Sequence, residues 1–176
     1  MNKICIYILL FSVFINAQNH KNQISLNADD IIPAFFSSNA SAYNLGYRRQ
    51  IKENKNLRIG LKYFQESENE FTLGIKPGID FAFNNSKKWI FYYGVDLALN
   101  YTDNLQSERI YYEAALIPFF RAEYVISDHF SISTEPGLFL KLLTIQDNDN
   151  SPIDNSNSIV SSGIGDLGII NINFSF

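Results

Sequence analysis

The fold is indicated by residues 89–101, whose sequence is WIFYYGVDLALNY. Every odd position of this stretch is aromatic or aliphatic, whereas the even positions include Gly94, Asp96 and Asn100. Because the side chains of a β-strand point alternately to its two faces, this spacing predicts one wholly apolar face and one small or polar face. An α-helix repeats every 3.6 residues and would scatter the same apolar residues around its surface.

The same two-residue period runs through most of the chain. It recurs at residues 43–51, 57–64, 71–83 and 130–142, in a mixed form at 109–126, and again in the last residues, 170–176. A further strand is expected around Gln23-Ile24-Ser25-Leu26, with residues 30–40 as the first long loop. These segments predict an all-β chain of eight strands.

The connections between the expected strands alternate in length. Short polar turns are expected at 52–55, 84–87 and 127–128, and longer, more acidic loops at 66–70, 102–108 and 144–160. This alternation is typical of an up-and-down antiparallel barrel whose two ends face different compartments. An even number of strands places both chain termini at the end with the short turns.

Composition excludes several classes of protein. The chain has 176 residues, 46% apolar and 15% aromatic, with a mean hydropathy of −0.08 and a formal net charge of −4. The apolar content excludes a disordered chain, and the negative charge provides no basic surface for nucleic acid. The absence of any run of 18 apolar residues excludes a helical membrane protein.

Residues 1–17 have the pattern of a signal peptide. Lys3 gives a positive start, residues 4–15 are apolar apart from Ser12, and Ala17 is a small residue at the expected cleavage site. We therefore expect an exported protein whose barrel domain comprises residues 18–176. The only cysteine, Cys5, lies in the signal peptide, so no disulfide contributes to the expected fold.

The polar faces of the expected strands are nearly neutral in charge and rich in glycine, alanine and serine. Their charged residues are Arg48, Arg58, Lys62, Lys76, Asp80, Asp96, Glu113, Arg121, Glu123, Glu135 and Lys141. Small residues with balanced charges suit the crowded lumen of an eight-stranded barrel better than a solvated surface, and unpaired charges there would be costly. We therefore expect an ion-paired lumen, so that replacing Arg121 or Glu113 by an apolar residue destabilises the barrel.

The apolar faces then point outward to lipid. Their aromatic residues gather near both ends of the strands, as in the two aromatic girdles of membrane barrels. The prediction is an eight-stranded antiparallel up-and-down transmembrane β-barrel. The opposite arrangement, with the apolar faces inside, would make a soluble periplasmic binding barrel.

The C-terminal tail resembles a known signal. Ile170, Ile172, Phe174 and Phe176 alternate with polar residues and end on a terminal phenylalanine, which resembles the last strand of bacterial outer-membrane barrels. The chain as a whole resembles the small OmpA/OmpX-type barrels, and its Pro-Gly pairs at 77–78 and 136–137 are similar to those of outer-membrane barrel domain proteins from Bacteroidetes.

The resemblance implies a monomer in the outer membrane of a Gram-negative bacterium, surrounded by outer-membrane lipid and lipopolysaccharide. It also implies that the barrel-assembly machinery reads the tail as an assembly signal. One feature departs from a regular strand pattern. Pro77, Pro118 and Pro136 fall inside expected strands, where each removes a backbone donor, so β-bulges are expected at these three positions.

One motif could support catalysis. The lipid A deacylase family pairs His-x-Ser with a nearby acid, and this chain has His129, Ser131 and Glu135. The motif directly follows an expected tight turn, its residues belong to the lumen phase, and Ile132 replaces the asparagine that follows the serine in that family. We therefore favour a non-enzymatic protein, with His129 as a turn residue and Ser131 as a small residue of the lumen.

No cofactor or metal site is predicted. The acidic run at 147–151, followed by Asp154, lacks the glycine and the distal glutamate of an EF-hand, which favours a solvated loop. The leading function is a closed barrel whose extracellular loops serve envelope structure or surface interaction. The alternative is a narrow, porin-like channel or small-solute binder in the same barrel, which requires a hydrated lumen.

Overall fold

A computed structural model gives the fold of the chain. It describes residues 21–28, 40–66, 70–86, 88–104, 106–147, 157–165 and 170–176. The predicted signal peptide, residues 1–17, and most of the predicted first loop, 30–40, lie outside the described residues. No helical segment in the described part of the chain is long and apolar enough to span a membrane.

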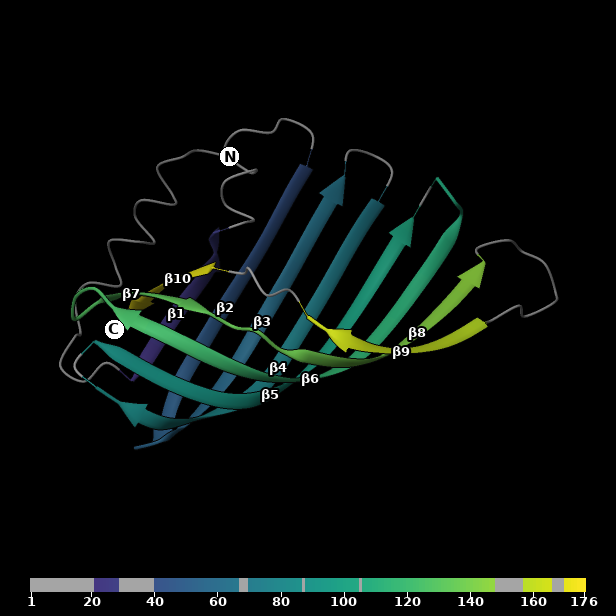
Figure 1. The fold of residues 1–176 in the computed structure, drawn as a ribbon. Coiled ribbons are helices and arrows are strands. Elements are labelled where there is room, and N and C mark those ends of the chain that lie inside the picture. Colours follow the sequence, from purple (N-terminus) through teal and green to yellow (C-terminus); the bar gives the residue numbers. More distant parts are fainter. Residues whose placement is uncertain are drawn as a thin grey trace, which may run out of the picture.

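The described residues form ten β-strands, all paired antiparallel (Figure 1). Their bounds are β1 Asn22–Asn27, β2 Ala40–Lys52, β3 Lys55–Glu66, β4 Glu70–Asn85, β5 Trp89–Asn104, β6 Arg109–Val125, β7 Phe130–Thr134, β8 Leu138–Asp147, β9 Asn157–Ile164 and β10 Ile170–Ser175. The first strand thus contains the predicted Gln23-Ile24-Ser25-Leu26 segment.

The ten strands make a closed barrel of eight. One half of β6 pairs with β7 and the other half with β8, in a single register that continues through the Phe119–Gly137 bridge. β7 and β8 are therefore one barrel strand, and β9 and β10, which pair with them, are another. β1 pairs with both β2 and β10 and so closes the barrel, which confirms the predicted eight-stranded antiparallel β-barrel.

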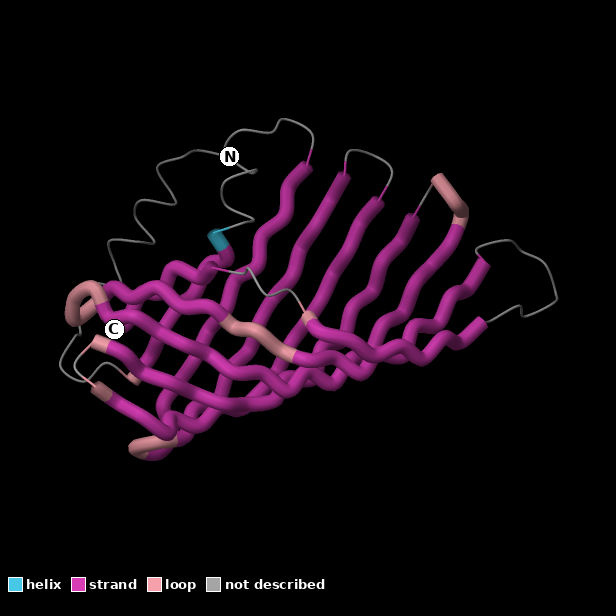
Figure 2. Tube along the Cα trace, in the orientation of Figure 1, coloured by secondary structure: helices cyan, strands magenta, loops and turns pink. Residues whose placement is uncertain are grey.

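The two ends of the barrel carry different connections. We call the end with turns 53–54, 86–88 and 126–129 and the C-terminus the turn end, and the end with connections 67–69, 105–108 and 148–156 the loop end. The predicted contrast in length is wrong for two connections, since 67–69 and 105–108 are no longer than 126–129. Strand pairing extends through polar residues to Glu66–Glu70 and Asn104–Arg109, because ladder hydrogen bonds do not require apolar side chains (Figure 2).

The predicted bulges are wrong at Pro77 and Pro118. Pro77 lies opposite Ile59, Pro118 lies opposite Val95, and the register is continuous through both pairs. Pro136 interrupts the pairing between β7 and β8 without shifting it, and its carbonyl oxygen accepts a hydrogen bond from the Phe120 amide. A proline lacks only a donor, so it fits a ladder wherever no acceptor faces its nitrogen.

Two register shifts lie away from the prolines. They are found at Gln50/Lys52 and Ala82/Asn84, beside two tight turns at the turn end. A third irregularity faces Pro136, because the span from Gly163 to Ile170 contains two more residues than the facing span from Thr134 to Phe139.

The two faces of the barrel wall differ sharply in chemistry. Leu97 faces outward and is 45% exposed, whereas its sequence neighbour Asp96 faces the lumen and is 1% exposed. Similar alternation runs along most of the strands, so large apolar side chains cover the outside, and polar or small ones, together with Tyr92 and Phe119, fill the lumen. The core of this barrel is therefore polar.

Candidate functional site

Three arginines cross the middle of the lumen. Arg48 on β2, Arg58 on β3 and Arg121 on β6 lie among four carboxylates from β4, β5, β6 and the β7–β8 junction. We call this group the arginine septum; it comprises Arg48, Arg58, Arg121, Asp80, Asp96, Glu123 and Glu135.

Arg48 binds Asp80 with two nitrogens. Its Nε lies 2.9 Å from Asp80 Oδ2, and its Nη2 donates to Asp80 Oδ1 over 3.0 Å. Its Nη1 lies 3.5 Å from Glu123 Oε2, and its guanidinium sits 3.9 Å from the centre of the Tyr92 ring. A bidentate pair of this kind, stacked on an aromatic ring, holds the arginine in one orientation.

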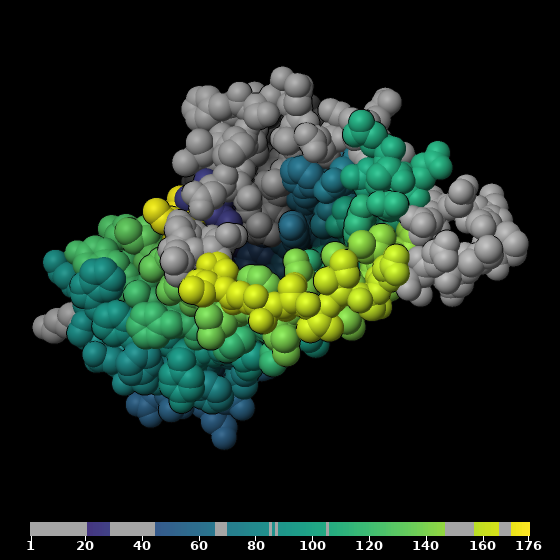
Figure 3. Space-filling model, turned by 45° about the vertical axis from the view of Figure 1, so that its right-hand side comes forward, coloured from purple at the N-terminus to yellow at the C-terminus, as the bar shows by residue number. Residues whose placement is uncertain are grey.

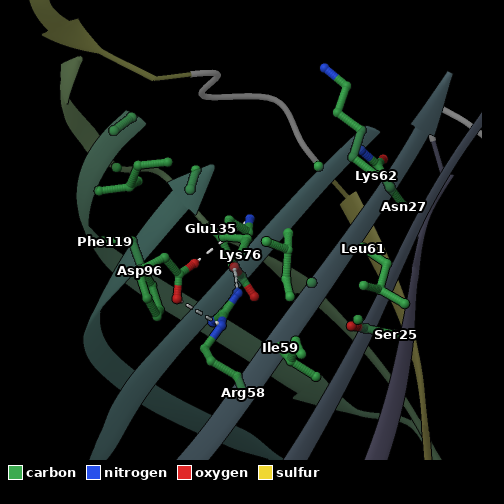
Figure 4. Close-up of a pocket in the computed structure, with 18 of the residues that line it drawn as sticks. Ser25, Asn27, Arg58, Ile59, Leu61, Lys62, Lys76, Asp96, Phe119 and Glu135 are labelled. Carbon is green, nitrogen blue, oxygen red and sulfur yellow. Dashed lines mark hydrogen bonds and ion pairs between the residues drawn. The ribbon is translucent and has the colours of Figure 1, made fainter. Parts of the chain in front are cut away.

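Arg58 contacts three carboxylates of the septum. It lies 2.6 Å from Glu135 Oε2 and 3.2 Å from Asp96 Oδ1 (Figure 4). It also lies 3.8 Å from Asp80 Oδ2. Its guanidinium is also 4.3 Å from the centre of the Phe119 ring. Arg58 therefore connects the carboxylates of β4 and β5 with Glu135, which follows β7.

Arg121 is the most deeply buried cation of the septum, with a side chain only 2% exposed. Its Nη2 lies 2.9 Å from Glu123 Oε2 and donates to Gln23 Oε1 over 2.8 Å, and its Nη1 lies 3.3 Å from Glu135 Oε1. The guanidinium thus contacts two carboxylates and one amide.

Neutral side chains add hydrogen bonds to the septum. Gln23 Nε2 and Ser131 Oγ both donate to Glu123 Oε1, over 2.8 and 2.5 Å. Asn56 Nδ2 donates to Asp80 Oδ1 over 2.5 Å. Since burying a charge is costly unless it is paired and hydrogen-bonded, these neighbours help to stabilise Glu123 and Asp80.

Two glycines make room for this arrangement. A Cβ atom built on Gly78 would overlap the Asp96 carboxylate, which lies directly opposite on β5. A Cβ built on Gly94 would overlap the Phe119 ring, on which Arg58 is stacked. The missing side chains at these positions set the depth at which the carboxylate and the ring can lie.

The septum separates two cavities in the described part of the lumen. A cavity of about 400 Å³ lies toward the loop end, and one of about 350 Å³ lies toward the turn end. Arg48 is the only described residue that lines both. Figure 3 shows the surface hollowed between the yellow-green atoms of β8 and β9 and the blue atoms of β3.

Three lysines and one more carboxylate line the cavity at the loop end. Lys141 Nζ lies 3.2 Å from Glu113 Oε2, and Asn100 Nδ2 donates to Glu113 Oε1 over 2.9 Å. Lys76 Nζ lies 3.7 Å from Asp96 Oδ2, at the edge of the septum. These side chains are more open than the septum, since those of Lys76 and Lys141 are 41% and 32% exposed.

Ten of the eleven charged residues assigned to the lumen from the sequence form ion pairs among the described residues. The remaining residue, Lys62, lines the loop-end cavity and has no ion-pair partner in the described part of the chain. The sequence analysis did not single out Gln23, Tyr92 or Phe119. Tyr92 has the same parity as Asp96 on β5, and Phe119 has the same parity as Arg121 on β6, so this signal could have identified both. Gln23 lies opposite Arg48, which only the register of β1 and β2 reveals.

The residues of the His-x-Ser motif bind other groups. A ring nitrogen of His129 lies 3.0 Å from the Ser175 carbonyl oxygen, and the ring stacks on Phe174. Ser131 is buried in the lumen and donates to Glu123. Glu135, the acid considered with them, pairs with Arg58 and Arg121. In this arrangement the Ser131 hydroxyl donates its hydrogen bond to the Glu123 carboxylate.

The C-terminal tail forms β10. Ile170 and Ile172 are half-exposed on the outer face, and the Phe174 ring lies 5.2 Å from Phe130 and 6.2 Å from Phe176. The Phe176 amide donates to the Asn22 carbonyl oxygen over 2.9 Å, and the Asn22 amide donates back over 3.1 Å. The last residue therefore contributes directly to the closure of the barrel.

The described residues contain no group of three or more His, Cys, Asp or Glu placed to hold a metal ion. Most of the acidic run at 147–151 lies outside them. Comparisons with protein-family models, curated proteins and solved structures return no significant match.

Proposed function

We propose that the protein is a non-enzymatic, integral barrel of a Gram-negative outer membrane, with a closed lumen and external loops that serve envelope structure or surface interaction. One observation carries this proposal: on the same strands, large apolar side chains face outward and charged ones face inward. A soluble protein with this wall would expose far more contiguous apolar surface than monomers tolerate. In a bilayer the same surface is buried against lipid.

Aromatic residues on the outer face support the same location. Near the turn end, the Trp89 ring stacks on Phe91 at 6.1 Å and lies 5.0 Å from Tyr124, while Phe83 lies 5.9 Å from Phe120. Nearer the loop end, the ring centres of Tyr101 and Tyr112 lie 5.6 Å apart, and those of Tyr63 and Phe71 lie 5.7 Å apart. Two such bands match the two interfaces of a bilayer.

The septum supports a closed lumen. Its charges are paired and its side chains are buried across the middle of the barrel, so a solute would have to break several ion pairs to pass. The cavities on either side favour the second candidate, a narrow channel. Recordings in planar bilayers distinguish the two candidates. The closed barrel should give no single-channel steps, whereas clear steps would identify the protein as a channel.

The proposed surroundings follow from the outer face and the tail. The partners are outer-membrane lipid and lipopolysaccharide around the wall, and the barrel-assembly machinery, which would read Ile170, Ile172, Phe174 and Phe176. The barrel closes on itself through β1 and β10, so a monomer suffices.

Fractionation of cells tests the location. The full chain should sediment with the outer membrane, resist extraction with carbonate, and change its gel mobility on boiling, as closed barrels in detergent do. Protease added to intact cells should cut the connections of the loop end and spare the turn at 53–54. Recovery in the aqueous phase without detergent, with no effect of boiling, would instead identify a soluble periplasmic barrel.

A further inference from the structure

We infer that the loop-end cavity is a binding site for a phosphate monoester group, carried by a small solute or by a lipid headgroup. The inference uses only the barrel and its lumen, and it does not depend on where the protein resides. The lining of the cavity carries more positive than negative side chains. Among the described lining residues, six are cationic, whereas three are carboxylates, Asp96, Glu113 and Glu135.

The septum accounts for part of this surplus. The three arginines also pair with Asp80 and Glu123, which lie outside the cavity lining. The positive charge of the guanidinium groups is therefore balanced partly by carboxylates that lie outside the cavity lining. The cations that remain for a ligand are the lysines 62, 76 and 141.

The lysines retain donors for a ligand. Each ammonium group has three N–H donors, and Lys76 and Lys141 each have one carboxylate within 4.0 Å. Lys62 is exposed and forms no ion pair with a described residue. Figure 4 shows it higher on the wall than Arg58 and the Asp96–Glu135 group. Lys62 is therefore the one cation of the cavity lining that has no ion pair with a described residue.

Small residues keep the cavity open beside these lysines. A Cβ atom on Gly74 would overlap the Asn100 amide oxygen and lie 3.1 Å from the Cβ of Lys62. One on Gly60 would lie 3.3 Å from the Cβ and Cε atoms of Lys76. Glycine at both positions leaves a volume of about 400 Å³, within the usual range for small-molecule sites.

The type of cation indicates the type of anion. Lysine acts as a compact point charge, whereas the planar fork of arginine selects a carboxylate in two-point geometry. Here every arginine that lines the cavity is paired with at least one carboxylate outside or at the floor of the cavity, whereas Lys62 has no ion pair with a described residue and Lys76 and Lys141 have one each. A phosphate monoester carries a charge of about −1.5 to −2 and three acceptor oxygens at neutral pH. It can therefore satisfy several ammonium groups at once.

Calorimetric titration of the full chain, folded in detergent, tests the site. Inorganic phosphate and glycerol 3-phosphate are the soluble probes, with chloride at equal ionic strength as the reference. We expect saturable binding of both probes. Mixed micelles that contain phosphatidic acid form the second arm: if that lipid displaces glycerol 3-phosphate and binds more tightly, the natural source is a headgroup, and if it does not compete, the source is a soluble phosphate.

Three variants make the test specific. Lys62→Gln should weaken phosphate binding about fivefold, and Glu113→Gln, which removes a competing carboxylate, should strengthen it by a similar factor. Lys88→Gln removes the same charge from an exposed residue at the turn end and should leave affinity within about twofold. Equal affinities for the two lysine variants, or no saturable binding of phosphate above the chloride reference, would overturn the inference.

Discussion

Replacing Arg121 by methionine removes the most buried cation of the arginine septum while keeping most of its side-chain volume. The substitution deletes ion pairs to Glu123 and Glu135, at 2.9 and 3.3 Å, and the hydrogen bond to Gln23. Both carboxylates stay buried beside their remaining arginines, Arg48 at 3.5 Å and Arg58 at 2.6 Å. The four carboxylates of the septum then face only two arginines and Lys76, which lies 3.7 Å from Asp96.

The expected loss of stability follows from burial. Removing one partner of a buried ion pair costs about 3 to 5 kcal/mol, because the other charge is left uncompensated. The surviving contacts of Glu123 and Glu135 place Arg121→Met at the lower end, about 3 kcal/mol. The Glu113–Lys141 pair differs, since its side chains are 26% and 32% exposed and water can solvate the survivor. Glu113→Leu should therefore cost only about 0 to 1 kcal/mol.

The two variants together form the assay. Unfolding of vesicle-inserted protein in urea can be followed by the fluorescence of the single tryptophan, Trp89, on the outer face of β5. A gap of about 2 kcal/mol corresponds to roughly thirtyfold in the unfolding constant. Adding Glu123→Gln to Arg121→Met should recover part of the loss. If Arg121→Met is no more destabilised than Glu113→Leu, the idea of a buried, paired septum fails.

Three further outcomes are expected. Gly94→Ala should destabilise the barrel by about 1 to 3 kcal/mol in the same urea assay, because its Cβ would overlap the Ile79 carbonyl oxygen and the Phe119 ring. Gly60→Ala should cost less, because its Cβ would come no closer than 3.3 Å to any atom of Lys76. Leu97→Arg should cost about 2 to 4 kcal/mol in vesicles if the outer face meets lipid, and a cost within about 0.5 kcal/mol would argue for a face in water. Deleting Phe176 removes two backbone hydrogen bonds to Asn22 and should lower the fraction of heat-modifiable barrel in cells, with Phe83→Ala, another outer-face aromatic, as the control; an equal yield for both variants would remove the tail's special role.

Much of the fold could be predicted from local pattern. The period of two assigned Asp96 inward and Leu97 outward, and it located the first strand near Gln23, because the pleat of a strand fixes the direction of each side chain. Local pattern was less informative about where strands end. The polar residues Glu70 and Asn104 look like loop in sequence, but both continue the ladder, since backbone pairing accepts any residue with a free N–H and C=O.

The prolines illustrate a second limit of sequence reasoning. Whether Pro118 disturbs a strand depends on which group of the neighbouring strand faces its nitrogen, and that is decided by register. Register is a property of two strands and cannot be read from either one alone. The expectation of bulges therefore failed at Pro77 and Pro118, whereas the strand that faces Pro136 does carry two extra residues, and Pro136 lies between β7 and β8 and not inside a strand.

The sequence by itself determined the two faces of the wall, the number of barrel strands and the near balance of charge in the lumen. Only the tertiary structure decided which charges meet. Arg58 and Glu135 are 77 residues apart, yet they lie within 2.6 Å, because the tilt and closure of the barrel bring β3 and the β7–β8 junction to the same level. The same geometry separates Lys62 from every described carboxylate. Charge composition is additive along the chain, whereas ion pairing depends on distance in space, so the sequence predicted a balanced lumen and the fold divided it into a paired septum and a cationic cavity.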